Sequence, residues 1–179
     1  MQNEQPTQFR GSSQLIQLSQ AGIFLAVLLA VQLLGLPNPV TGILVNALLT
    51  FVLLHLGTRY ALMLATLSPL GGIVSGHLPA VLYPLLPVIM CGNILMLAGY
   101  SLMRNMPAVA RYAVPAAIKG AVIWGAGMMI IEFLKIAASA QWLIVPVLGM
   151  QFFTAAVGLL AGEKLFAAIS RSMVQSGHS

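Results

Sequence analysis

Six apolar runs, each near the length needed to cross a lipid bilayer, follow one another along a chain of 179 residues. A helix needs about 20 mainly apolar residues to cross the hydrocarbon core, so six such helices use most of the chain. Only 6% of the residues are charged, whereas a soluble domain carries roughly 25%. The sequence therefore predicts an all-α integral membrane bundle of six transmembrane helices.

Proline, glycine and basic residues separate the runs. The predicted spans cover residues 15–36, 41–56, 60–74, 84–103, 112–135 and 142–169. We expect residues 1–14 to form a polar N-terminal tail, residues 15–170 the helical domain and residues 171–179 a C-terminal tail. The second and third spans are short, so each either tilts little or is partly re-entrant. The first run exceeds the apolar core of a signal peptide, and we expect it to remain as a span.

Basic residues set the predicted orientation. If the N-terminus is cytoplasmic, the outer loops hold only Lys135, and the inner segments hold Arg10, Arg59, Arg104, Arg111, Lys164 and Arg171. An excess of Lys and Arg is typical of cytoplasmic loops. We therefore expect both termini to be cytoplasmic in a cell membrane. The net charge of +5 then reflects topology and not a nucleic-acid-binding surface.

The sequence lacks the motifs that nucleotide binding, metal binding and hydrolysis usually require. There is no Gly-rich phosphate-binding loop, no His-x-x-x-His pair or carboxylate cluster for a metal, and no aspartate. Ion-coupled transport normally uses an ionisable group near the bilayer centre. Lys119 lies within the fifth span, but we expect its side chain to reach the cytoplasmic side and to have no binding role. We therefore expect no enzymatic activity, no cofactor and no bound metal.

Small residues recur at intervals of four in several spans, which places them on one helix face. In the first span they are Gly22, Ala26 and Ala30, and in the sixth Gly158 and Gly162. Membrane helices pack closely through such residues. One interpretation is packing within the bundle. The other is that the face of the first span docks another membrane protein.

Polar side chains within apolar spans are costly and usually have a task. The substrate-binding candidates are His77, Asn93, Glu132 and Gln151, all expected in the outer half. Asn93 and Gln151 could instead form hydrogen bonds between helices. Glu132 could be neutralised by Lys135 three residues later, and His77 could be a solvated loop residue. With so few charges, we expect a small ligand that is largely uncharged or aromatic.

Several segments, together with the small size and inner termini, are similar to one family of membrane proteins. The segments are Leu36-Pro37, residues 41–47, residues 67–72, residues 76–79 and Pro84–Asn93, with the Ala26-x-x-x-Ala30 element in the first span. The chain resembles the substrate-binding S components of energy-coupling factor (ECF) transporters, in an unassigned subgroup. The metal-specific members have an N-terminal histidine, whereas this chain begins Met1-Gln2-Asn3, so uptake of nickel or cobalt is not expected.

The resemblance implies that transport is shared among several subunits with different roles. An S component captures a micronutrient from outside and docks through its first helix on a coupling transmembrane subunit, which a pair of cytoplasmic ATPases drives. The alternative is a structural or assembly subunit of a larger membrane complex, without a ligand of its own. A polar outer pocket would favour the transporter, and a solidly packed interior would favour the structural subunit.

Overall fold

The chain folds into a helical bundle in the computed structural model, which describes residues 8–76, 80–136 and 138–176. These residues form no strand. The elements are α1 (Gln8–Leu33), α2 (Asn38–His55), α3 (Thr58–Val74), the 3-10 helix η1 (Ala80–Leu85), α4 (Leu86–Leu102), α5 (Ala108–Phe133) and α6 (Ala138–Ser176). The all-α prediction is confirmed. Helix α1 begins at Gln8 and α6 continues to Ser176, so helix extends into both segments that the sequence suggested as tails.

Five helices in the described part of the chain are long and apolar enough to cross a membrane: α1, α2, α4, α5 and α6. Helix α3 has 17 residues, which gives a length of about 26 Å at 1.5 Å per residue. Large apolar side chains such as Ile23, Met129 and Phe153 are exposed on the outside of the bundle. Exposed apolar side chains of this kind can contact lipid, which is consistent with a multi-pass membrane protein.

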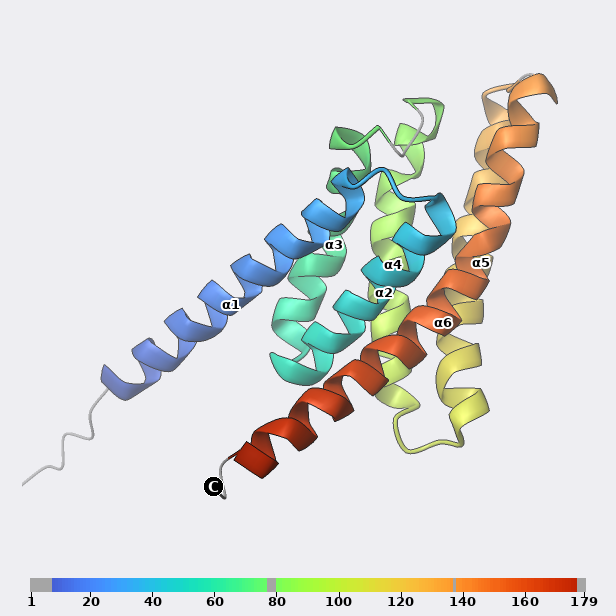
Figure 1. The fold of residues 1–179 in the computed structure, drawn as a ribbon. Coiled ribbons are helices and arrows are strands. Elements are labelled where there is room, and N and C mark those ends of the chain that lie inside the picture. Colours follow the sequence, from blue (N-terminus) through green and yellow to red (C-terminus); the bar gives the residue numbers. More distant parts are fainter. Residues whose placement is uncertain (1–7, 77–79, 137, 177–179) are drawn as a thin grey trace, which may run out of the picture.

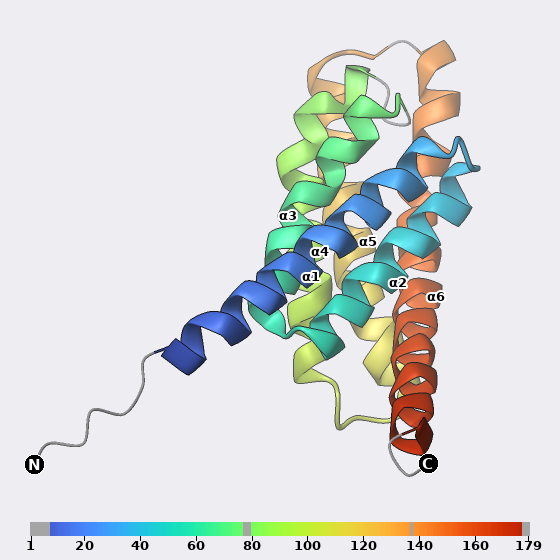
Figure 2. The same cartoon turned by 60° about the vertical axis from the view of Figure 1, so that its left-hand side comes forward.

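The helices run up and down, so successive connections lie at alternate ends of the bundle (Figures 1 and 2). Helix α1 begins and α6 ends at the same end of the bundle, where α2 also meets α3 and α4 meets α5. This end contains Arg59, Arg104, Arg111 and Lys164, and we call it the basic end. Lys135 follows α5 at the opposite end. The backbone turns there because Lys135 adopts a φ of 49° and Ile136 N donates to Ile131 O at 3.0 Å, which closes the helix.

Helices α2 and α6 pack backbone to backbone through the small residues of α6. A Cβ atom at Gly158 would overlap the side chain of Asn46 and lie 2.9 Å from Ile43 O. A Cβ atom at Gly162 would overlap Ala47 O in the same way. Only glycine permits this approach, so the small residues of the sixth span serve packing within the bundle.

The small residues of α1 are placed differently. Gly22, Ala26 and Ala30 are all exposed, and a Cβ atom at Gly22 would meet nothing within 4 Å. The opposite side of the helix packs on the bundle through Ala21 and Leu28. The N-terminal part of α1 also extends away from its neighbours (Figures 1 and 2). The small-residue face of α1 therefore has no packing role among the described residues.

Candidate functional site

A cavity of about 150 Å³ lies inside the bundle, and every one of the six α-helices contributes to its lining. Residues from the end of α1 and the start of α2 line it, which places its mouth towards the end opposite the basic end. The polar residues in the lining are Gln32, Asn38, Thr41, Asn46, Ser68, Asn93, Lys119 and Gln151. Polar side chains therefore line a space between the six helices, in addition to the buried apolar core.

The polar network of this cavity forms around a backbone carbonyl that Pro69, inside α3, leaves without its helical donor. Proline has no backbone N–H, so the carbonyl four residues earlier lacks its helical donor. That carbonyl belongs to Ala65, and it accepts hydrogen bonds from Asn93 Nδ2 at 3.3 Å and from Ser68 Oγ at 3.3 Å. Asn93 Nδ2 also donates to Ser68 Oγ at 3.2 Å. A side chain of α4 thus satisfies a backbone group that the proline in α3 leaves open.

These contacts fix the orientation of the Asn93 amide. If the amide were flipped, its oxygen would face the Ala65 carbonyl oxygen, and two acceptors would repel each other. Asn93 Oδ1 is therefore directed away from α3. It is buried without a hydrogen-bond partner in the described part of the chain, and the residue is only 2% exposed. A buried acceptor without a donor costs about 1–3 kcal/mol, so this oxygen favours a bound molecule that supplies a donor.

A hydrogen bond from Gln32 joins α1 to α3 beside the same cavity. Its Nε2 donates to Ser68 O at 3.1 Å, and the side chain is buried. The contact depends on Gly71, where a Cβ atom would lie 2.7 Å from Gln32 Nε2. The end of α1 is therefore part of the cavity wall, although most of that helix is exposed.

Lys119 does not extend its side chain to the end of the bundle that we expected to be cytoplasmic, so that expectation is wrong. It is 3% exposed, and its Nζ donates to Asn46 Oδ1 at 2.6 Å. Its side chain packs beside Gly92 of α4, where a Cβ atom would lie at contact distance, 3.5 Å, from Lys119 Cγ. The ammonium group therefore belongs to the cavity.

The position of Lys119 explains this outcome. It lies 11 residues after Ala108, where α5 begins, or about 17 Å along the helix at 1.5 Å per residue. A four-carbon side chain does not span that distance. A lysine in the centre of a span is the sequence signal that could have assigned it to the site.

The structure brings together two of the four predicted substrate-binding residues. Asn93 and Gln151 both line this cavity, and the Nε2 of Gln151 makes a long bond of 3.4 Å to Val147 O in its own helix. Glu132 is exposed near the end of α5 and does not line the cavity. It forms no ion pair with Lys135 among the residues described. His77 lies outside the described residues.

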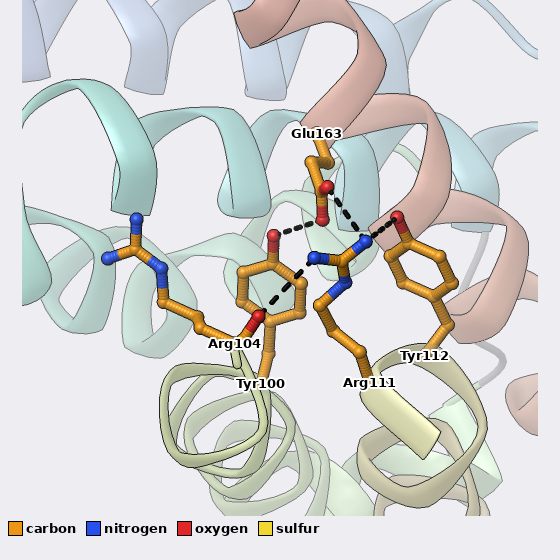
Figure 3. A network of polar contacts seen from close by, with 5 residues as sticks. All are labelled: Tyr100, Arg104, Arg111, Tyr112 and Glu163. Carbon is orange, nitrogen blue, oxygen red and sulfur yellow. Dashed lines mark hydrogen bonds and ion pairs between the residues drawn. The ribbon is translucent and has the colours of Figure 1, made fainter. Parts of the chain in front are cut away.

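A second polar cluster lies at the basic end, where α4, α5 and α6 meet (Figure 3). Tyr100 Oη donates to Glu163 Oε2 at 2.5 Å, and Arg111 Nη2 lies 3.2 Å from Glu163 Oε1. Arg111 also donates to the hydroxyl of Tyr112 and to the backbone carbonyl of Arg104. The side chains of Tyr100 and Arg111 both point to the Glu163 carboxylate. Glu163 thus contacts both α4 and α5 through charged or polar side chains, which is the arrangement of a cluster that joins helices, although Arg111 Nε is buried without a partner among the described residues.

Among the described residues, no three His, Cys, Asp or Glu side chains come together as a metal site would require. Comparisons with protein-family models, with curated proteins and with solved structures give no match for this chain. The cavity and the surface of α1 are therefore the features that bear on function.

Proposed function

We propose that the chain is the substrate-capture subunit of an ECF-type importer, and that it binds a small micronutrient in the six-helix cavity. The observation that carries the proposal is the Asn93 Oδ1 acceptor, buried without a partner beside an interior cavity. A buried polar atom without a hydrogen-bond partner is costly in a protein without a ligand. A bound molecule removes that cost.

In the proposed topology all six helices cross the membrane and both termini are cytoplasmic. Helix α3 is included because it begins after α2 at the basic end and leads to η1 at the opposite end. The basic end faces the cytoplasm, since Arg59, Arg104 and Arg111 lie there and cytoplasmic loops favour basic residues. The mouth of the cavity, near Asn38, then opens to the outside of the cell membrane.

The chain contains no nucleotide-binding loop, so import driven by ATP requires a partner that binds the nucleotide. The small-residue face of α1 is the proposed docking surface for a coupling transmembrane subunit, which a pair of cytoplasmic ATPases would drive. Only 11% of the α1 span is buried inside the bundle, against 33% to 44% in the other four long apolar helices. Exposed Gly22, Ala26 and Ala30 allow another helix to approach closely.

A structural subunit without a ligand is the alternative. It would need no polar cavity, and it would gain stability from a packed interior. The eight polar residues around the cavity favour the transporter.

Purification of the tagged chain in a mild detergent from its own cells tests the proposal. We expect one membrane subunit and two nucleotide-binding ATPases to copurify, as identified by mass spectrometry. Replacing both Ala26 and Ala30 with Leu should remove these partners and leave the isolated bundle folded, because both side chains are exposed. The matched control is Ala168→Leu, an exposed alanine on α6, which should retain them. A fixed set of partners without an ATPase would contradict the proposal.

A further inference from the structure

We infer that the molecule held in the cavity is a small organic acid, with its anionic group at Lys119 and a hydrogen-bond donor at Asn93 Oδ1. The inference rests on the proposed function, because it describes the ligand of the same cavity. It also revises the sequence-based expectation of a largely uncharged ligand, since that expectation placed Lys119 at the cytoplasmic side.

The first step is the missing counter-charge. Lys119 is 3% exposed, and no carboxylate is among the residues that line the cavity. Glu163 pairs with Arg111 at the basic end, and Glu132 is exposed. In the part of the chain that is described, no side chain of the cavity lining therefore supplies a negative charge to pair with Lys119.

The second step is the unused hydrogen-bonding capacity of the amine. A lysine ammonium has three N–H donors, and the structure gives one acceptor for them, Asn46 Oδ1 at 2.6 Å. Asn46 is itself 1% exposed, so it holds the amine in place beside the cavity. The remaining donors suit a carboxylate, phosphonate or sulfonate oxygen.

The third step is energetic. A buried charge is costly unless it is paired and hydrogen-bonded, and the low dielectric of the interior strengthens a pair once it forms. If the empty cavity holds a neutral amine, an entering acid transfers its proton to Nζ, and the same ion pair results. In either case the anionic group of the ligand supplies the negative charge that the cavity lining lacks.

Asn93 defines the other end of the ligand. Its Oδ1 can only accept, so the ligand presents an O–H or N–H group there. The cavity of about 150 Å³ has the size of an engineered cavity that holds benzene. Together these features point to a small hydroxy acid, an amino acid or an aromatic acid that carries an O–H or N–H group.

The test compares acids with their amides on the purified full chain in detergent. The probes are lactate and lactamide, 4-hydroxybenzoate and 4-hydroxybenzamide, and pyrrole-2-carboxylate and pyrrole-2-carboxamide, with chloride and phosphate as inorganic anions. The readout is the midpoint of thermal unfolding. Small molecules retained during purification are identified in parallel by mass spectrometry. The variants are Lys119→Met, which removes the charge, and Lys119→Arg, which keeps it; Lys119→Gln replaces the methionine variant if that fails to fold.

We expect the retained molecule or at least one acid to stabilise the wild type and Lys119→Arg, and its amide to have no effect. For the retained molecule, loss of Lys119 should weaken binding at least about 30-fold, as for other buried charge pairs. A retained molecule without an acidic group, equal effects of acids and amides, or an unchanged response of Lys119→Met would overturn the inference and leave the proposed function standing. Equal stabilisation by chloride or phosphate would indicate an adventitious anion site and would also overturn it. If the wild type retains no molecule and responds to no probe, both proposals fail.

Discussion

Lys119 Nζ donates a 2.6 Å hydrogen bond to Asn46 Oδ1, and this contact joins α5 to α2 across the interior of the bundle. The two residues are 73 positions apart in the sequence. Both are almost completely buried. The contact holds an amine in a cavity that is surrounded by membrane-spanning helices.

The Lys119–Asn46 contact can be measured by a double-mutant cycle. Asn46→Ala removes the acceptor and leaves a buried amine unpaired, so it should destabilise the ligand-free protein. In the Lys119→Met background the same change should cost less, with an interaction free energy of roughly 0.5–3 kcal/mol. The measurement is reversible unfolding in mixed detergent. Strict additivity of the two substitutions would show that the contact does not contribute to stability.

Gly158 should tolerate no side chain. Gly158→Ala places a methyl group against Asn46 and Ile43 O, which forces α6 away from α2. We expect a loss of about 1–3 kcal/mol of unfolding free energy, as for other overpacked sites. Gly125→Ala is the matched control, since a Cβ atom there meets nothing within 4 Å. Equal stability of the two variants would mean that the α2–α6 approach is less close than described.

The cluster at the basic end should act as a structural link between helices. Tyr100 is 1% exposed and donates to the Glu163 carboxylate. Tyr100→Phe removes a hydrogen bond to a charged group and should cost about 1.5–3 kcal/mol of stability. Tyr112→Phe, which removes an acceptor for Arg111 at the half-buried edge of the cluster, should cost less. Ligand binding should be unchanged in both variants, because neither residue lines the cavity. A change in ligand affinity would contradict this separation of the two polar regions.

The orientation can be tested with single cysteines in a Cys91→Ala background. Cys91 is the only native cysteine and is exposed, so it must be removed first. A cysteine at Asn105, between α4 and α5, should react with an impermeant thiol reagent only from the cytoplasmic side. A cysteine at Gln141, near the start of α6, should react only from outside. The same accessibility at both positions would rule out an odd number of crossings between them and contradict the six-span topology.

Hydropathy and helix-breaking residues predicted the helices well, because the bilayer imposes a length on each apolar run. Predicted span 60–74 and observed α3, Thr58–Val74, differ by two residues at one end. Asn93, Glu132 and Gln151 were predicted to share one pocket; Asn93 and Gln151 line the cavity and Glu132 does not. Amide side chains within an apolar span can be recognised in the sequence as candidate site residues, because polar groups in the membrane cost free energy and usually have a function.

The contacts of the cavity could not be predicted in the same way. Asn93 bonds to Ala65 O only because α3 and α4 are adjacent and Pro69 frees that carbonyl, and the sequence does not contain the rotation of either helix. Lys119 was assigned to the wrong region because the sequence does not show which side of α5 is buried. Likewise, the same spacing of small residues gives a packed face in α6 and an exposed face in α1.

The most direct test of the account is the affinity of the retained small molecule for the purified chain. Once it is identified, calorimetry should compare the wild type with Asn93→Ala and Gln151→Ala, and with Asn105→Ala as a control at the basic end. Loss of one buried hydrogen bond, worth about 1–3 kcal/mol, should weaken binding by roughly 5- to 150-fold in each cavity variant. The control should bind as the wild type does. A wild type that retains no molecule, or unchanged affinity in both cavity variants, would contradict a ligand site in this cavity.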